Sequence, residues 1–295
     1  MKPKDYEALL PTIELGDCIP RLIHQTYKSK TDLEEKLLDN IERIKQMNPS
    51  WSYTLYDDED IRDFIQGEYG LEVWQYYERI ERSYGAARAD LFRYLLMYKR
   101  GGVYLDIKSS FTQPLDEVLS DSDLYILSPW DNLPGQEYEG FGMLPELTFL
   151  PRGEYIQWAI ICAPGHPFLR AVLIQVFKNI DHYEPFSCGV GLYGVIKTTG
   201  PVAYSHAIEP VRQQLDKGKY RLLNWPGEVG LQYSIYHQQG AYAHKKALKA
   251  NYNIKHIPVI KQNYHPLKGR LVNGLLWLRL VGQILRDKLK RIKSK

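Results

Sequence analysis

The chain has 295 residues and a formal net charge of +3 at pH 7, with 44% hydrophobic residues and 23 tyrosines. That length buries a sizeable core, which excludes a small scaffold held together by disulfides. Three cysteines without paired or metal-type spacing argue against a disulfide framework and favour a reducing compartment. The chain has no run of about eighteen apolar residues, so no transmembrane helix is expected. The N-terminus has no apolar segment of signal-peptide type.

The first part of the chain predicts alternating strands and helices. In chain order the patterns indicate a strand over 19–27, an amphipathic helix over 32–47, a strand over 52–56, and helices that begin at 57 and cover 71–84. The four acids at 57–60 are interpreted as the cap and first turn of a helix rather than as a metal site. Carboxylates at such a position stabilise the unpaired N–H groups of the first turn.

The stretch GAARADLFRYLLMYKRGGVYLDIKSS is the one around which we expect the fold to be organised. Its first part predicts a helix over 85–100 with one apolar face. Gly101 and Gly102 then supply the left-handed residue that commonly ends a helix. The short apolar strand over 103–107 is expected at the centre of a sheet. Asp106 interrupts that strand, and a carboxylate in a core strand requires a cation or a hydrogen-bond donor.

The second half predicts fewer regular elements. The patterns indicate a strand over 123–127, an irregular stretch over 129–151, a strand over 155–163, and helices that begin at Pro167 and at Val202. A long irregular loop inside a compact domain is usually functional. His166 precedes a proline at the first position of a helix, so we interpret it as structural rather than catalytic.

Four charged residues are expected to meet at one end of the sheet. Asp90 and Arg93 are three residues apart on one helix face. If that helix packs antiparallel to the next strand, this face lies over the strand end that carries Asp106 and Lys108. Carboxylates suit sugar hydroxyls, and cations suit a diphosphate. The alternative is structural, with Asp90 capping the helix, Arg93 at the surface and Asp106 in a buried ion pair.

These residues resemble the signature of DXD-type glycosyltransferases of family 32, which include capsular-polysaccharide sugar transferases. In that family the helix pattern A-x-x-D-x-x-R-Y is followed by G-G-[IV]-Y-x-D-x-D. The matching residues are Ala87, Asp90, Arg93, Tyr94, Gly101, Gly102, Val103, Tyr104 and Asp106. The segment at 19–27 and the T-G-P at 199–201 are similar to further elements of the family.

The resemblance implies an α/β fold of GT-A type over residues 1–267, with a Rossmann-like nucleotide-binding sheet and helices on both faces. It implies a retaining transferase that moves a sugar from a UDP- or GDP-sugar to a hydroxyl of a glycan or lipid-linked acceptor, in the synthesis of cell-surface polysaccharide or another glycan. The donor-binding residues it implies are His24, Gln25, Thr26, Asp90, Arg93, Tyr104 and Asp106. The catalytic residues it implies are Arg93, Asp106 and Lys108, and the acceptor candidates are Trp130, Tyr138 and Glu146.

One position departs from the pattern, because Lys108 stands where the family has the second aspartate of D-x-D. In the family the two carboxylates hold a divalent cation, Mn²⁺ or Mg²⁺, that bridges the donor diphosphate. Asp106 remains a candidate ligand, and His244 is a candidate for the late histidine that completes some of these sites. A lysine cannot be an acidic ligand, but it can itself neutralise a diphosphate. The alternative is a degenerate protein that binds nucleotide-sugars without catalysis.

Residues 268–295 form a separate basic tail in this interpretation. They contain nine Lys or Arg and one Asp, which leaves 29 basic and 34 acidic residues for the rest of the chain. One helical stripe is apolar, formed by Leu271, Leu275, Leu278, Leu285, Leu289 and Ile292. A basic amphipathic helix of this kind binds in the membrane interface. The structural alternative is a helix that packs on the core and has a solvated end. The functional alternative is a membrane scaffold that acts through the tail.

The expected setting follows from these features together. We expect a cytoplasmic protein, peripheral on the cytoplasmic face of a membrane. Its expected partners are a nucleotide-sugar, a glycan or lipid-linked acceptor and the membrane surface. Nucleic acid is not expected, because the body of the chain is acidic and its basic residues are not interleaved with a stacking surface.

Overall fold

The computed structural model describes residues 4–224, 227–236 and 255–293. The strands are β1 (Leu22–Thr26), β2 (Ser52–Tyr56), β3 (Gly102–Leu105), β4 (Ser110–Phe111), β5 (Tyr125–Leu127), β6 (Ala159–Cys162), β7 (Arg221–Leu222) and β8 (Leu231–Gln232). The helices are α1 (Glu35–Met47), α2 (Asp58–Arg79), α3 (Gly85–Arg100), α4 (Leu115–Val118), α5 (Pro167–Asp181), α6 (Pro185–Cys188), α7 (Gly191–Thr198), α8 (Pro201–Gln214) and α10 (Pro266–Lys293). Short 3-10 turns are η1 (Glu7–Leu9), η2 (Pro145–Leu147) and η3 (Lys217–Lys219).

The main sheet has six strands in the order β2-β1-β3-β6-β5-β7, and β4 pairs with β8 in a second small sheet. Strands β2, β1 and β3 are parallel, so their carboxyl ends share one edge. Strand β6 runs antiparallel to β3, with Leu105 opposite Ala159. The residues just before β6 therefore reach the same edge as the residues just after β3. This edge is where the sequence placed the charged cluster.

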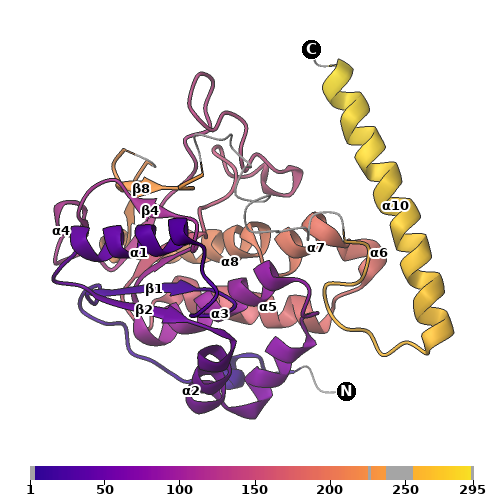
Figure 1. The fold of residues 1–295 in the computed structure, drawn as a ribbon, viewed down its shortest axis with the longest axis horizontal. Coiled ribbons are helices and arrows are strands. Elements are labelled where there is room, and N and C mark those ends of the chain that lie inside the picture. The colour runs from indigo at the N-terminus through magenta and orange to yellow at the C-terminus, as the bar shows by residue number, and fades with distance from the viewer. Residues whose placement is uncertain (1–3, 225–226, 237–254, 294–295) are drawn as a thin grey trace.

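Side chains alternate between the two faces of the sheet and build two hydrophobic clusters. Tyr104 and Ile160 belong to the cluster that contains α2, α3, α5 and α8. Val103 and Ile161 belong to the cluster that includes Ile44 of α1 together with β4 and α4. Figure 1 shows α1 on one side of strands β1 and β2 and α2 on the other. The predicted α/β class, with helices on both faces of the sheet, is confirmed.

Helix α3 has the predicted bounds and ends at the predicted glycines. Gly101 and Gly102 have φ values of 64° and 93°, which a residue with a Cβ rarely adopts. The prediction of a single apolar face was wrong in extent, because every side chain from Asp90 to Tyr98 is buried. The helix packs against α2, α5 and β3, so it meets neighbours on most of its surface. Strand β3, which follows it, lies inside the sheet as predicted.

Other elements were predicted in kind and differ in their bounds. The Asp57 carboxylate accepts bonds from the backbone N–H groups of Glu59 and Asp60, and Asp60 bonds back to the Asp57 N–H group. The prediction that these acids cap a helix is confirmed. That helix, α2, continues to Arg79 with a break at Gly70, where φ is 81°. The separate helix that the sequence predicted over 71–84 is therefore present after this break, but it ends at Arg79, before the isolated bridge at Ile80.

Helix α10 runs along the outside of the fold beside α6 (Figure 1). Val272 and Leu276 pack against Val190 and Phe186, and the helix confirms the predicted helical tail. The predicted apolar positions Leu285, Leu289 and Ile292 have side chains that lie outside the described residues. Across the described parts of the chain, no helix combines the length and the apolarity that a membrane crossing requires.

Gly102 offers a test of how closely the central strand must approach its neighbour. A Cβ at this position would lie 2.5 Å from the Leu22 carbonyl oxygen, and its φ is positive. We expect Gly102→Ala to lower the free energy of unfolding by about 1–3 kcal/mol from backbone strain, with the steric clash in addition. Urea unfolding monitored by circular dichroism measures this change.

The matched control is Gly67→Ala, at an exposed helical position where an added Cβ meets no atom within 4 Å. That substitution should raise stability by about 0.5–1 kcal/mol, because alanine favours a helix interior more than glycine does. Equal changes in the free energy of unfolding for the two substitutions would contradict the prediction that Gly102 is needed at this position.

Candidate active site

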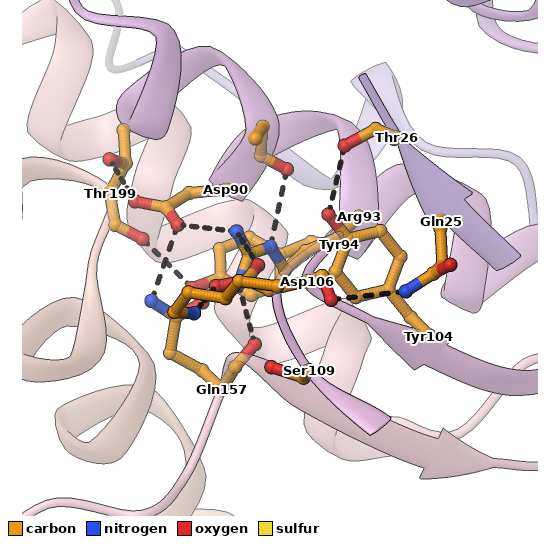
Figure 2. A network of polar contacts seen from close by, with 12 residues as sticks. Gln25, Thr26, Asp90, Arg93, Tyr94, Tyr104, Asp106, Ser109, Gln157 and Thr199 are labelled. Carbon is orange, nitrogen blue, oxygen red and sulfur yellow. Dashed lines mark hydrogen bonds and ion pairs between the residues drawn. The ribbon is translucent and has the colours of Figure 1, made fainter. Parts of the chain in front are cut away.

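The candidate site lies at the edge where β3 ends and β6 begins. Only Gly101 separates α3 from β3, so the helix turns back antiparallel to the strand. The first half of α3, with Asp90 and Arg93, therefore lies over the end of β3 that carries Asp106. A backbone hydrogen bond joins the two segments at this edge, because the Asp106 N–H group donates to the Trp158 carbonyl oxygen at 2.8 Å. Figure 2 shows the resulting polar network.

Arg93 is the centre of this network, and all three of its nitrogens contact protein oxygens. Its Nε donates to the Ala89 carbonyl oxygen at 3.3 Å, and its Nη1 lies 2.8 Å from both the carbonyl and the side-chain oxygen of Gln157. Its Nη2 lies 3.3 Å from Asp90 Oδ1 and 3.0 Å from Asp106 Oδ1. The guanidinium also lies 4.8 Å from the ring centre of Tyr104. Arginine offers five donors in a fixed plane, and here each of the three nitrogens that carry them contacts the protein.

Asp90 is a buried interior residue and not a helix cap. Its Oδ2 accepts a hydrogen bond from the Thr199 hydroxyl at 2.9 Å, and its Oδ1 accepts one from Gln157 Nε2 at 3.2 Å. Burial raises the pKa of this carboxyl, and the charge of Arg93 opposes the rise. The structural alternative placed Arg93 at the surface and Asp90 at a cap, and both placements are wrong. The structural alternative also included an ion pair of Asp106, and that ion pair is present.

Asp106 joins two cations and is the most exposed of the four charged residues. Its Oδ1 contacts Arg93, and its Oδ2 lies 2.6 Å from Lys108 Nζ. The Asp106 side chain is 24% exposed, whereas those of Arg93 and Lys108 are 4% and 8% exposed. Burial lowers the pKa of Lys108, and the Asp106 carboxylate opposes this shift. A ligand can therefore approach the cluster from the side of Asp106.

Strand β1 brings two of its three predicted residues to this edge. Gln25 Nε2 donates to the Asp106 carbonyl oxygen at 3.1 Å, and the Thr26 hydroxyl lies 3.1 Å from the hydroxyl of Tyr104. His24 points elsewhere, because its Nε2 lies 3.2 Å from the carbonyl oxygen of Gly101, at the opposite end of β3. Burial lowers the pKa of His24 to about 4, so the ring is neutral at pH 7.

The predicted irregular stretch is confirmed, and its aromatic residues are mostly buried. Trp130 and Tyr138 are each 4% exposed and pack together with Tyr233. The Trp130 indole donates at 2.7 Å to Glu154, whose pKa burial raises to about 7. These rings form part of the core beside the site and do not present an open stacking surface. Glu146 lies apart from them in an ion pair of 2.7 Å with Lys197.

Sequence reasoning missed three members of the network. Gln157 contacts both Asp90 and Arg93, and Tyr94 donates to Gln157 and to the carbonyl oxygen of Thr199. The T-G-P match contained Thr199 and was the available signal for that residue. Gln157 had no motif, because its role depends on the antiparallel pairing of β6 with β3.

The residues at the site fit a divalent cation poorly. Both carboxylate oxygens of Asp106 already contact cations, and Asp90 faces the interior. Among the described residues, no group of three or more His, Cys, Asp or Glu side chains could hold a metal ion. Mg²⁺ and similar ions need several oxygen ligands in regular geometry. The candidate ligand His244 lies outside the described residues.

Residues 34–125 match the family model described as "Glycosyltransferase sugar-binding region containing DXD motif". The matched segment contains all four charged residues of the site. The resemblance to this glycosyltransferase family, which the motif pattern indicated, is therefore confirmed over this segment.

The similar curated proteins are mannosyltransferases of yeasts. Inositol phosphoceramide mannosyltransferase 3 of Schizosaccharomyces pombe is 36% identical over 63% of this chain and 44% of its own length. A mannosyl phosphorylinositol ceramide synthase of Saccharomyces cerevisiae is 34% identical over 63% of this chain and 41% of its own length. The chain thus spans less than half the length of these two relatives. Among solved structures, the PaToxG glycosyltransferase has a TM-score of 0.49 and 13% identity, over 90% of this chain and 88% of that one.

Arg93 should be required for stability because it neutralises two partly or fully buried carboxylates. We expect Arg93→Met to lower the free energy of unfolding by about 3–5 kcal/mol, the usual cost of leaving a buried charge without its partner. Urea unfolding at pH 7 measures the loss.

The matched control is Arg62→Met on α2, which removes an exposed arginine paired with Glu59 and Asp63. Exposed ion pairs contribute little to stability, so this variant should have nearly the same free energy of unfolding as the unchanged protein. A loss at Arg93 no larger than the loss at Arg62 would contradict the central role given to Arg93.

Proposed function

We propose that this protein is a retaining glycosyltransferase of GT-A type that transfers a sugar from a nucleoside-diphosphate sugar to a hydroxyl acceptor. In this proposal residues 1–267 form the transferase unit and residues 268–295 form a membrane-binding tail. Mannose is the first sugar to test, because several similar yeast proteins are named mannosyltransferases.

One observation carries this proposal. The segment that matches the glycosyltransferase family contains Asp90, Arg93, Asp106 and Lys108, and these side chains meet at the carboxyl edge of the parallel strands. Ligands of open α/β sheets bind in the crevice at this edge.

The chemistry of such a transfer suits the charges at the site. The bond between the anomeric carbon and the phosphate oxygen breaks, and a bond from the same carbon to the acceptor oxygen forms. The diphosphate leaves with the electron pair, and the acceptor proton passes to a phosphate oxygen on the same face. Positive charge held beside the leaving diphosphate lowers the barrier, which is often the largest contribution of such a site. In the proposed site Asp106 contacts the donor, and Thr26 and Tyr104 line the approach.

Donor binding and transfer test the proposal together. We expect GDP-mannose or a UDP-sugar to raise the midpoint of thermal unfolding, since a ligand of the folded state stabilises it by mass action. With a glycan or lipid-linked acceptor, release of nucleoside diphosphate measures transfer. Asp106→Asn should reduce the rate of transfer by about 100-fold or more, while Asp63→Asn at an exposed position of α2 should not change it.

The outcomes separate the candidates. Stabilisation with turnover supports the transferase, and stabilisation without turnover against any acceptor supports the degenerate donor-binding protein. Absence of binding to every nucleotide-sugar would contradict both. The thermal midpoint of each variant without ligand reports whether it is folded.

The acceptor and the location are proposed from the tail and from the relatives. The names of the relatives include inositol phosphoceramide, a lipid that carries its hydroxyls at a membrane surface. In α10 the exposed side chains include Leu267, Leu271, Leu275, Trp277 and Leu278. Lys268, Arg270 and Arg279 are exposed on the same helix. We therefore propose that α10 lies on an anionic membrane and holds the site near lipid-linked acceptors.

Vesicle sedimentation tests the membrane proposal. The protein should bind vesicles of phosphatidylcholine mixed with phosphatidylserine, and salt should weaken this binding because it screens the basic residues. Replacing Leu271, Leu275 and Leu278 together by serine should weaken it by about tenfold or more, given the free energy of burying each leucine.

The matched control is Leu71→Ser, which changes an equally exposed leucine on α2 and should not alter vesicle binding. A protein that binds no vesicles and forms a dimer that the leucine substitutions abolish would overturn the membrane proposal. In that case the stripe would be an interface between two copies of the chain.

A further inference from the structure

The lysine at position 108 has a consequence for how the site handles a diphosphate. This inference rests on the proposed function, because it concerns the donor of the same reaction. In the family pattern the residue two positions after Asp106 is a second carboxylate. In this chain it is a lysine whose Nζ lies 2.6 Å from Asp106 Oδ2.

The formal charge of the site is the same in the two arrangements. An aspartate together with a divalent cation carries one positive charge, and a single lysine carries the same charge. The remaining charges of the cluster, on Asp90, Arg93 and Asp106, are common to both. Lys108 therefore supplies the electrostatic balance that the family obtains from a carboxylate and its metal ion.

The geometry agrees with this exchange of a metal for an ammonium. The Lys108 side chain is 8% exposed, and its Nζ contacts Asp106, the carboxylate with the greatest exposure in the cluster. A charge removed from water in this way interacts more strongly with a nearby anion. Its Nζ also lies 4.4 Å from the ring centre of Tyr233, and its carbonyl oxygen accepts a bond from the Ile235 N–H group. These contacts hold the ammonium in one place.

Lys108 also retains donor capacity that Arg93 lacks. All three nitrogens of Arg93 contact protein oxygens. An ammonium has three N–H donors, and within the described part of the chain the hydrogen bond recorded for Lys108 Nζ goes to Asp106. A phosphate oxygen that approaches beside Asp106 can thus be bound by Lys108 without breaking the Arg93 network.

We propose that this site binds the nucleoside diphosphate of its donor without a divalent cation, with the Lys108 ammonium as the charge that faces the diphosphate. The same ammonium then stabilises the diphosphate when the bond to the anomeric carbon breaks. The metal is absent from this proposal because the described residues at the site offer it a single, already paired carboxylate.

Calorimetric titration with GDP and with UDP tests the proposal on the unchanged full-length protein. The dissociation constant of the nucleotide that binds should agree within about twofold between buffer with EDTA and buffer with Mn²⁺. A dissociation constant at least about tenfold larger in EDTA would overturn the proposal. That result would not contradict the proposed glycosyl transfer, so a failure of this inference can be distinguished from a failure of the proposed function.

Lys108→Asp provides a second, sharper test because it restores the family pattern. This change lowers the charge of the site by two, which one divalent cation restores. We expect Lys108→Asp to bind the nucleotide in Mn²⁺ at least about tenfold more tightly than in EDTA, and Lys108→Met to bind weakly in both. Binding by Lys108→Met as tight as that of the unchanged protein would overturn the proposal.

Two controls accompany these variants. Lys217→Asp makes the same charge reversal at an exposed lysine of η3 and should leave binding insensitive to EDTA. The thermal midpoint of each variant reports folding, and the titration of the unchanged protein decides the question even if a variant does not fold. If neither GDP nor UDP binds under any condition, both this inference and the proposed function are wrong.

Discussion

The buried guanidinium of Arg93 is the interaction on which the candidate site depends. Its three nitrogens connect a helix, the end of one strand and the start of the antiparallel strand beside it. A buried ion of this kind is costly unless it is paired and hydrogen-bonded, and here Arg93 contacts two carboxylates and donates to Ala89 and Gln157. The network therefore holds Asp90 and Asp106 in fixed positions, which is the preorganisation that a charged ligand requires.

This arrangement divides the four charged residues into two roles. Asp90 and Arg93 face inward and are satisfied by Thr199, Gln157 and each other. Asp106 is 24% exposed and contacts Lys108, which is 8% exposed. The family resemblance grouped all four as donor-binding or catalytic residues. In the proposed function Asp106 and Lys108 contact the ligand, and Asp90 and Arg93 position them.

The central elements could be predicted because their local signals agree. The helix formers before Gly101, the paired glycines and the apolar strand after them all indicate the same α3–β3 unit, and the acids at 57–60 cap α2 as expected. Boundaries elsewhere shifted by several residues, because the ends of α1, β5 and β6 depend on pairing with distant segments. The aromatic residues of the irregular stretch were expected to face a ligand. Trp130 and Tyr138 instead complete a hydrophobic cluster with Trp158 and Tyr233, segments whose proximity no local pattern records.

The sequence alone predicted the resemblance to the family, the helix that carries Asp90 and Arg93, the strand that Asp106 follows, and the departure at Lys108, since each is a matter of residue type at short spacing. The tertiary structure decided which oxygens and nitrogens meet. It placed Gln157 beside Arg93 through the pairing of β6 with β3, and it turned His24 toward Gly101, away from the site. It also left a row of leucines on α10 exposed by packing Val272 and Leu276 inward. These outcomes depend on contacts between residues far apart in the chain, which periodicity and motif spacing do not encode.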